Sequence, residues 1–418
     1  MYELENALRD YAWGSRTAIA GLLGRPGSGG PEAELWIGAH PGAPSKARRP
    51  DGSEAPLDAL ISSDPEHFLG SESVAEFGPR LPFLTKLLAA AQPLSLQVHP
   101  SIEQAKEGFA RENAAGIAQD AANRNYRDDN HKPEMILALT PFESLCGFRA
   151  PAATRQILLH VAGCFDPVEG DVPALLNELL DDLGSPNEGV GLRNAFERLI
   201  NGGDKVSEAT AMVAAALASG APLAPYQAEL STVVSLNEQY PGDPGVLISL
   251  LLNRISLAPG EAVYLPEGKV HAYLSGLGVE VMASSDNVLR GGLTPKFIDV
   301  PELLRTVDFT SVAVPMLTPE FSALGQELYR PPFREFQLQR IELAPGAAPV
   351  PIAQSGAAVV LVVSGAVYLD SPKGDLKLAR GGSAFLAASE APVNAHPVAG
   401  ASEAAVAFAV TTGAGKGA

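Results

Sequence analysis

The sequence predicts a mainly β protein in which two barrel-like blocks are separated by a helical insertion. Three observations predict it: short apolar or alternating runs broken by Gly and Pro, a middle stretch with helical spacing, and a return to strand-like runs. Two turn-and-strand passages, LAPGEAVYLPEGKVHAYL and LARGGSAFLAASEAPVNAH, can also be laid loosely over each other. This likeness suggests that the two β blocks are related barrels.

The first part of the chain, residues 1–150, is expected to be β with helical decoration. Its strand-like runs include AELWIGAHP and EMILAL, and a helix is expected over SIEQAKEGFARENAAGIAQ. Residues 151–239 then change character, because apolar residues recur every three or four positions and several segments end in Gly. We predict a helical insertion there, formed by AATRQILLHVAG, VPALLNELLDDLG, GLRNAFERLING and SEATAMVAAALASG.

Strand-like sequence returns after the insertion. Residues 240–315 contain RISLAP, EAVYLP and VEVMA, and they are expected to complete the first β block. Residues 316–418 contain FQLQRIELAPG, AAVVLVVSGAVYLD and GSAFLAAS, and they are expected to form the second block. The insertion would therefore interrupt one barrel and leave the other continuous in sequence.

The composition limits the possible partners. Of 418 residues 46% are hydrophobic, and 30 Lys and Arg against 48 Asp and Glu give a formal net charge of −18. Because no block of Lys and Arg interrupts this charge, nucleic acid and anionic membranes are not expected as partners. No apolar run approaches the roughly 20 residues of a membrane span, and the N-terminal stretch has no signal-peptide pattern. A cytoplasmic protein is expected.

The stretch LSLQVHP carries the first chemical signal. Apolar and polar residues alternate in it, which is typical of a β-strand with one apolar and one polar face. Gln97 and His99 leave the same face, close enough to share one ligand. A metal site is one explanation, and an ordinary polar outer face is the other.

A second signal lies in PGEAVYLPEGKVHAYLS. Its Gly and Pro residues turn and bend the chain around one strand, and the next strand presents His271 inward. The spacing G-x5-P-x-G-x2-H resembles the second metal-binding motif of cupins, which are small jelly-roll barrels. Ser275 stands where the cupin pattern has Asn, at a position that binds no metal. LSLQVHP then fits the first cupin motif with Gln97 in place of a His, and both blocks are expected to be cupin-like jelly rolls.

The carboxylate that such a site needs lies in DDNHKPEM. Glu134 opens the strand EMILAL, and Pro133 suits the first position of a strand, where a missing N–H does least harm. The candidate metal ligands are Gln97, His99, Glu134 and His271. Two imidazoles, one carboxylate and one amide suit Zn²⁺, with Fe²⁺ and Mn²⁺ as alternatives. The three motifs together favour a metal over a solvated polar face.

These motifs, with YAWGS, LPFLTKLL, LNEQYPGDPG and MASSDNVLRGGLTPKFIDV, resemble the type I phosphomannose isomerases as far as about Asp299. The C-terminal block resembles them only in its β-rich character. The resemblance implies one Zn²⁺ per chain on the four ligands named above. It also implies interconversion of mannose 6-phosphate and fructose 6-phosphate, with a place in carbohydrate metabolism and GDP-mannose formation.

An isomerisation through a cis-enediolate needs an electrophile, a base and a grip on the phosphate. The resemblance marks Arg290 as catalytic, although Gly291 beside it replaces the expected Ala. Glu280 alternates with apolar neighbours and is a candidate base or partner for Arg290. Further candidates are listed by role: Lys132, His131 and Tyr273 for proton relay or substrate hydroxyls; Ser95, Lys86 and Lys296 for the phosphate; and Glu34 for the pocket wall.

Two other function classes remain open on the sequence. A non-catalytic cupin that senses sugar phosphates would keep the ligands and bind without turnover. An iron-dependent cupin oxygenase is the other, although Gln97 in place of a histidine makes it less attractive. The C-terminal block lacks the spaced Pro, Gly and His of the motif, so we predict no metal there. The sequence leaves the oligomeric state open, and a monomer is plausible.

Overall fold

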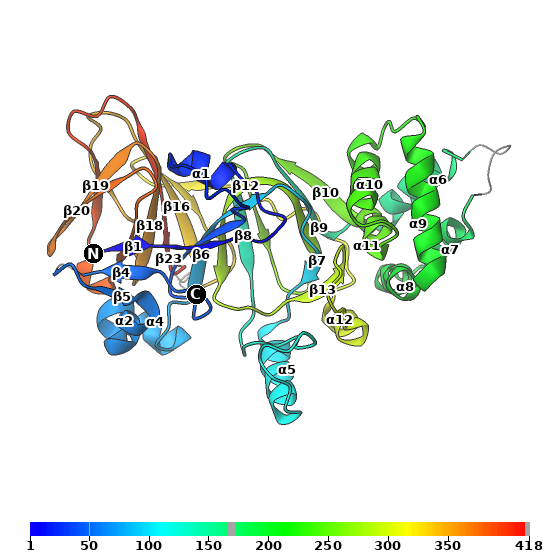
Figure 1. Ribbon diagram of the computed structural model, residues 1–418, viewed down its shortest axis with the longest axis horizontal. Helices are drawn as coiled ribbons and strands as arrows, with labels where there is room; N and C mark the ends of the chain where they lie inside the picture. The colour runs from blue at the N-terminus through cyan, green and yellow to red at the C-terminus, as the bar shows by residue number, and fades with distance from the viewer. Residues whose placement is uncertain (50, 166–171, 414–418) are drawn as a thin grey trace.

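The computed structural model describes residues 1–49, 51–165 and 172–413, and three blocks lie in a row along its longest axis (Figure 1). Two sheets stand at one end, a ten-stranded sheet lies in the middle, and a group of helices stands at the other end. Helices and strands each take 30% of the chain. The structure is therefore mixed α/β rather than mainly β: several antiparallel sheets and the predicted helical segment are present, and short helices also fill connections between strands.

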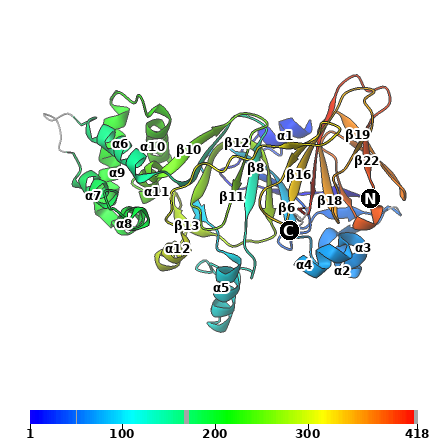
Figure 2. The same cartoon turned by 180° about the vertical axis from the view of Figure 1, so that it is seen from behind.

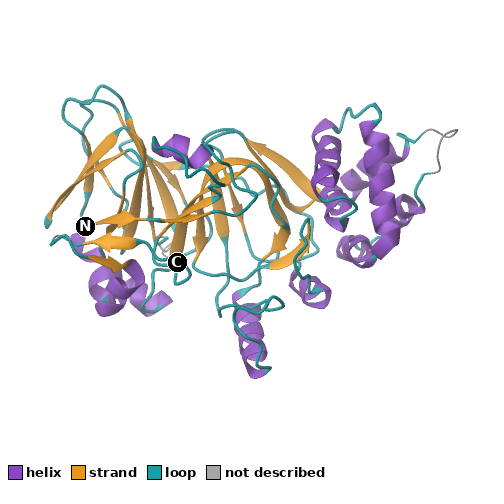
Figure 3. Cartoon of the chain, viewed as in Figure 1, coloured by secondary structure: helices purple, strands orange, loops and turns teal. Residues whose placement is uncertain are grey.

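The ten-stranded sheet, at the centre of Figure 3, is organised around one long strand, β12, which pairs with four others. Because β9 precedes the helical segment and β10 follows it, their pairing closes this sheet across the insertion. The strands are β2 (Ala7–Arg9), β3 (Glu34–Ile37), β6 (Phe83–Ala90), β7 (Leu96–Val98), β8 (Glu134–Ala138), β9 (Phe142–Phe148), β10 (Leu252–Leu257), β11 (Ala262–Leu265), β12 (His271–Ala283) and β13 (Leu289–Gly292).

The other two sheets belong mainly to the C-terminal part of the chain. The nine-stranded sheet has the order β14 (Glu320–Phe321), β15 (Glu327–Tyr329), β16 (Gln337–Leu343), β23 (Ala405–Thr411), β18 (Ala358–Ser364), β21 (Ser383–Leu386), β1 (Tyr2–Glu5), β4 (Lys46–Arg48) and β5 (Glu54–Pro56). The four-stranded sheet has the order β17 (Val350–Pro351), β22 (Asn394–Pro397), β19 (Ala366–Ser371) and β20 (Gly374–Ala379). Because β1 pairs with β21, the N-terminal strand joins the C-terminal block.

Alternate residues of β18 explain how these sheets pack. Val359 and Leu361 enter a core shared with the ten-stranded sheet, whereas Val360 and Val362 enter the core under the four-stranded sheet. Successive strand residues point to opposite faces, so a strand buried on both sides reads as one apolar run. The run AAVVLVV therefore lies in the nine-stranded sheet, with the core of the ten-stranded sheet on one side and that of the four-stranded sheet on the other.

The helices occupy the insertion and the loops at the sheet edges. Those of the insertion are α6 (Pro151–Ala162), α7 (Ala174–Asp182), α8 (Glu188–Asn201), α9 (Gly203–Ala218) and α10 (Gln227–Gln239), followed by α11 (Pro244–Ile248) and η1 (Ser249–Leu251). The others are α1 (Ala18–Leu23), α2 (Leu57–Ser63), α3 (Pro65–Leu69), α4 (Ser71–Phe77), α5 (Ile102–Ala114), α12 (Val300–Thr306) and η2 (Ala388–Glu390). None of the helices within the described ranges is long and apolar enough to cross a membrane.

Two features of this arrangement position the candidate site. Ser101 and Gln104 form a capping box that starts α5 directly after β7. In both views α5 and α12 lie below the ten-stranded sheet, on the same side of it (Figures 1 and 2). Along β12, Val279 and Val281 enter the shared core, while Glu280 points to the opposite face. That opposite face carries the polar side chains of the site.

Candidate metal centre

Four side chains meet at one end of the ten-stranded sheet, and they are the four predicted metal ligands. The Glu134 carboxylate lies 3.3 Å from His99 Nε2 and 3.5 Å from His271 Nε2. The Gln97 amide nitrogen lies 3.2 Å from His271 Nε2. The three ionisable residues are almost fully buried, and one candidate ligand atom from each lies within 4.8 Å of the others.

Strand register brings these residues together from distant parts of the chain. Gln97 in β7 is directly opposite His271 at the start of β12, and on its other side it is opposite Arg290 in β13. Directly opposite residues of an antiparallel pair share a face of the sheet. Glu134, the first residue of β8, is opposite Met282 near the far end of the same long strand. The sheet therefore closes far enough to bring both ends of β12 near one site.

Backbone carbonyl groups orient both imidazole rings. His99 Nδ1 lies 2.7 Å from the Asn287 carbonyl oxygen, and His271 Nδ1 lies 3.0 Å from the Lys269 carbonyl oxygen. Because a carbonyl only accepts, each Nδ1 carries the proton and donates it, and each Nε2 presents its lone pair toward Glu134. The Asn287 side chain is itself fixed by hydrogen bonds to Asp128 and Asn130. This is the supporting arrangement that imidazole ligands of metals need.

The donor set fits a zinc ion. His99 Nε2 and Glu134 Oε2 are buried without a hydrogen-bond partner, which is costly unless something else binds them. Burial lowers the pKa of His99 to about 4, more than the Glu134 charge raises it, so the ring is neutral and able to bind a metal. Gln97 would offer its carbonyl oxygen after a half-turn of its amide, which exchanges the oxygen and nitrogen within the same space.

A buried charge cluster lines the wall next to the candidate ligands. Lys86 Nζ lies 2.8 Å from Glu280 and 3.8 Å from Glu34. Burial opposes the charge on Lys86, but the two carboxylates raise its pKa above the ordinary value. Burial raises the pKa of Glu280, and Lys86 only partly offsets this. Glu34 also accepts a hydrogen bond of 2.6 Å from Trp36 Nε1. Glu280 is therefore paired with Lys86, and of its two predicted roles, base or partner of Arg290, the second has no ion pair to support it among the described residues.

Lys132 and Tyr273 flank the same space. Lys132 Nζ lies 3.3 Å from the Glu134 carboxylate and is mostly buried. Tyr273 is fully buried, and its hydroxyl has no hydrogen-bond partner. Burial, followed by the charges of Glu280 and Glu134, raises the pKa of Tyr273 well above the ordinary value. Tyr273 is therefore a proton donor rather than a base in this state.

Arg290 lies at the outer side of the site among other cations. Burial, and then the charge of Arg127, lowers the pKa of Arg290. Burial, Arg290 and Arg127 likewise lower the pKa of Lys296. Within the described ranges of the chain, Arg290 has no carboxylate within ion-pair distance. None of these three cations forms an ion pair with a carboxylate among the described residues, and Ser95, half-buried just before β7, lies on the neighbouring segment.

Sequence reasoning missed Arg127 and Asn287. Asn287 lies within one of the motifs that carry the family resemblance, so its position was available but its role of fixing Asp128 and His99 was not. Arg127 is an exposed arginine in a loop, one of 30 Lys and Arg residues, and no local pattern distinguishes it. Only the folded chain brings it near Arg290.

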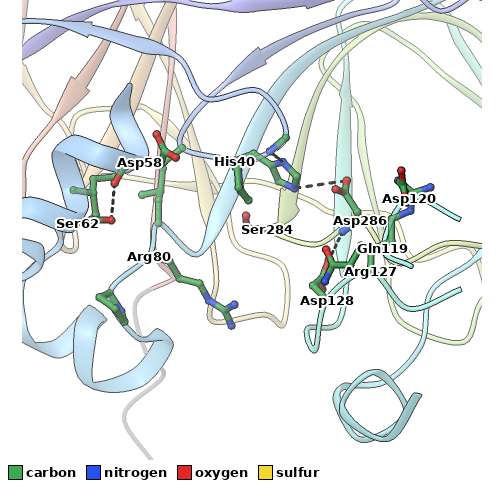
Figure 4. Close-up of a pocket in the computed structure, with 16 residues that line it drawn as sticks. His40, Asp58, Ser62, Arg80, Gln119, Asp120, Arg127, Asp128, Ser284 and Asp286 are labelled. Atoms are coloured by element: carbon green, nitrogen blue, oxygen red, sulfur yellow. Dashed lines mark hydrogen bonds and ion pairs between the residues drawn. The ribbon is translucent and has the colours of Figure 1, made fainter. Parts of the chain in front are cut away.

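A cavity of about 540 Å³ lies beside this cationic group, between α2 and the loop that carries Arg127 (Figure 4). His40 is buried in its wall, where His40 Nδ1 accepts a hydrogen bond of 3.1 Å from the Gly42 N–H. Its other nitrogen therefore carries the proton and faces Asp286 at 3.6 Å. The candidate metal ligands do not line this cavity, so it is separate from the metal centre.

Comparison with known proteins identifies relatives along nearly the whole chain. The model of the family "Phosphomannose isomerase type I, catalytic domain" matches residues 1–151. The mannose-6-phosphate isomerase of Escherichia coli K12 is 41% identical over 396 residues, which cover 94% of this chain and 96% of that protein. The human mannose-6-phosphate isomerase is 34% identical over 416 residues, covering 93% and 94%.

Solved structures show the same likeness in three dimensions. A zinc-bound mannose 6-phosphate isomerase superposes with a TM-score of 0.85 at 39% identity, covering 99% of each chain. A variant of the phosphomannose isomerase from Salmonella typhimurium superposes with a TM-score of 0.87 at 38% identity, covering 99% of this chain and all of that one. With the metal-site geometry above, these full-length matches show that the chain belongs to the type I phosphomannose isomerase (mannose-6-phosphate isomerase) family.

Proposed function

We propose that this protein is a zinc-dependent aldose-ketose isomerase that interconverts mannose 6-phosphate and fructose 6-phosphate. The observation that carries the proposal is the buried cluster of His99, Glu134 and His271, with atoms that lack hydrogen-bond partners, in a member of this family. Gln97 would complete the four ligands of one Zn²⁺ per chain. When bound, zinc would polarise the substrate oxygen next to the reacting carbons and stabilise negative charge there.

The charge cluster beside the metal ligands supports proton transfer through a cis-enediolate. Glu280 is the candidate base, because burial raises its pKa and a carboxylate of raised pKa accepts a proton more readily. Lys86 keeps this buried carboxylate charged. Because two carboxylates already neutralise Lys86, we assign Lys86 to proton transfer rather than to phosphate binding. Lys132 and Tyr273 would donate hydrogen bonds to substrate oxygens. Glu34 would hold Lys86 in place.

The cations at the outer side of the site support a phosphate-binding role. The charge of Arg127 helps to lower the pKa values of Arg290 and Lys296, Arg290 also lowers that of Lys296, and a dianionic phosphate would relieve this repulsion. A chain with a net charge of −18 needs such a local concentration of positive charge to bind an anion. Ser95 would add a hydroxyl donor. Arg290, next to Gln97, would also be near the reacting carbons.

The finer organisation of the chain is proposed in the same way. Residues 1–150 and 240–315 would form a cupin-like jelly roll that carries the site, interrupted by the helical insertion of residues 151–239. Residues 316–418, of which the last five lie outside the described chain, would form a second jelly roll without a metal. Strands β1, β4 and β5 depart from this division, because they pair within the nine-stranded sheet. A cytoplasmic protein without nucleic-acid or membrane partners remains our expectation.

The direct test is conversion of mannose 6-phosphate to fructose 6-phosphate by the purified protein. We expect activity that disappears after chelation and returns with Zn²⁺. Running the reaction in deuterated water would test the proton-transfer step, since an enediolate exchanges its proton with solvent and deuterium should enter the product. Tight binding of the sugar phosphate without conversion would favour the sensor, and Fe²⁺-dependent oxygen uptake would favour the oxygenase.

A further inference from the structure

A half-buried histidine next to the site is held between carboxylates from two other parts of the chain. His131 Nδ1 lies 3.1 Å from Glu267, in the turn between β11 and β12. His131 Nε2 lies 2.5 Å from Glu335, in the segment between β15 and β16. A carboxylate only accepts hydrogen bonds, so both ring nitrogens must donate and the ring is an imidazolium.

The charge balance of this bridge supports that protonation state. Burial alone would lower the pKa of His131, but the hydrogen bonds from the ring to Glu267 and Glu335 raise it to about 9. The pKa of Glu335 is lowered, because its contacts with the imidazolium outweigh its burial. Near neutral pH the ring thus has neither a free lone pair nor a proton to release. His131 is a fixed cation in this arrangement, rather than an acid or a base.

The bridge acts on the loop that leads into the metal centre. Residues 128–133 have no regular secondary structure, and the first part of this loop is held by hydrogen bonds from Ser285 and Asn287 to Asp128. Its last part runs directly into Glu134. Lys132 lies between the bridge and that carboxylate, and within the part of the chain that the structure describes its side chain forms one ion pair, with Glu134 at 3.3 Å. The backbone is also held at Asn130 and Pro133, whose carbonyl oxygens accept hydrogen bonds from the strand-end segment 283–287. Between these two points the bridge adds a restraint at His131, the residue next to Lys132.

Glu335 is itself firmly placed, because its segment is packed against the ten-stranded sheet. The Tyr329 hydroxyl donates a hydrogen bond of 2.9 Å to the Gly260 carbonyl oxygen. The Phe333 ring packs edge-on against Tyr264, with centroids 5.8 Å apart, and Phe336 is fully buried. A carboxylate fixed to this extent can define where an imidazolium lies.

We infer that Glu335 is a positioning residue through which the C-terminal block takes part in the reaction. By holding His131 against Glu267, it sets the loop that places Lys132 at the metal centre. The inference rests on the proposed function and adds to it, because it gives the block without the metal a role in the rate of the reaction. Glu335 does not touch the candidate ligands.

The test compares Glu335→Gln with a variant of the adjacent residue. Arg334 forms an exposed ion pair of 2.6 Å with Glu76, so Arg334→Ala removes a charge contact from the same segment without touching the bridge. For Glu335→Gln we expect kcat to fall roughly 10-fold, as for groups that orient metal-site residues. KM and bound zinc should change little. Arg334→Ala should keep kcat within about 2-fold, since exposed ion pairs contribute little.

Two further variants separate positioning from a loss of stability. Glu335→Asp keeps the charge on a shorter side chain and should recover part of the lost kcat. In a double-mutant cycle, Glu335→Gln should have little further effect on kcat once His131→Ala is present, because both act through one bridge. All measurements are made on zinc-loaded protein below the onset of unfolding, with melting temperatures recorded.

Three results would overturn the inference. The first is a Glu335→Gln protein with the kcat of the unaltered protein, and the second is additive effects of Glu335→Gln and His131→Ala. The third is a fall in kcat of the same size in the Glu335→Gln and Arg334→Ala proteins, accompanied in both by the same fall in melting temperature. In all three cases the unaltered protein remains an isomerase. No conversion by the unaltered, zinc-loaded protein would instead overturn the proposed function, and this inference with it.

Discussion

Strands β12 and β18 occupy corresponding places in neighbouring sheets, yet they treat their two faces differently. β18 sends apolar side chains to both faces, and each face enters a core. β12 sends Val279 and Val281 to the core that it shares with β18, but its other face carries His271, Tyr273 and Glu280. One face of each sheet thus builds the joint between them. The remaining face of β18 packs in a second apolar core, whereas the remaining face of β12 carries the side chains of the candidate site.

This difference shows that the two strands contribute differently to the free energy of unfolding. The buried polar face of β12 includes atoms without hydrogen-bond partners and a lysine between two carboxylates. Such groups cost stability in an apo fold, and a bound metal or substrate would recover that cost. The apolar faces of β18 gain stability without any ligand. Changes on the two strands should therefore separate activity from stability.

The largest effect is expected from breaking the polar face at its metal. His271→Ala should lower kcat about 10³-fold, because a lost metal contribution of several kcal/mol has that size. Bound zinc should fall in parallel. Folding should persist, because the apolar face of β12 is untouched. Metal analysis and steady-state kinetics on the same sample would check this, and a zinc-free variant that retained normal kcat would contradict it.

The second prediction concerns the buried ion pair between Lys86 and Glu280 on the polar face of the ten-stranded sheet. Glu280→Gln leaves the buried Lys86 without its nearest carboxylate and should cost about 3 kcal/mol of unfolding free energy. The double variant Lys86→Met, Glu280→Gln should recover most of that loss, since it also removes the buried lysine charge that the single variant leaves without its nearest partner. Neither protein should be active. Urea unfolding and kcat would be measured together, and an active double variant would remove this pair from the mechanism.

The matching change on β18 should give the opposite result. Val360→Ala leaves a small cavity under the four-stranded sheet and should lower the unfolding free energy by about 2 kcal/mol. Bound zinc and kcat should stay as in the unaltered protein, measured at a temperature where both are folded. A large loss of kcat would mean that the two sheets are coupled more tightly than their separate faces suggest.

The smallest effect concerns the bridge that joins the two blocks. The pKa of His131 is about 9 in the fold and 6.5 ordinarily, so the folded state binds the proton more tightly. This stabilisation is complete below about pH 6.5 and is lost as the pH rises through about 9. The unfolding free energy should fall over that range by on the order of 1 kcal/mol more in the unaltered protein than in Glu335→Gln. Equal pH dependence in both would contradict the bridge.

Local patterns were sufficient for the candidate ligands. The alternation around Gln97 and His99, the bends before His271 and the start of a strand at Glu134 are all readable within a few residues. A helical segment was also predictable, because its spacing persists over four stretches that match α6 to α9, although α10 was not among the stretches named. The family resemblance then related these motifs to one reaction.

Long-range pairing could not be read in this way. The contact of Lys86 with Glu280 depends on the register of β6 against β12, and that of Glu335 with His131 depends on how two blocks dock. The pairing of β1 with β21 likewise joins opposite ends of the chain. Nothing near these residues in sequence distinguishes them from surface charges or ordinary strands.

The central claim is that the polar face of the ten-stranded sheet is a zinc site that catalyses the isomerisation. The most direct test is to return Zn²⁺ stepwise to chelated protein and to measure both bound zinc and conversion of mannose 6-phosphate. We expect activity to rise in proportion to bound zinc and to level off at one equivalent per chain, with no rise for His271→Ala. Full conversion by zinc-free protein, or zinc bound at this site without conversion, would contradict the account.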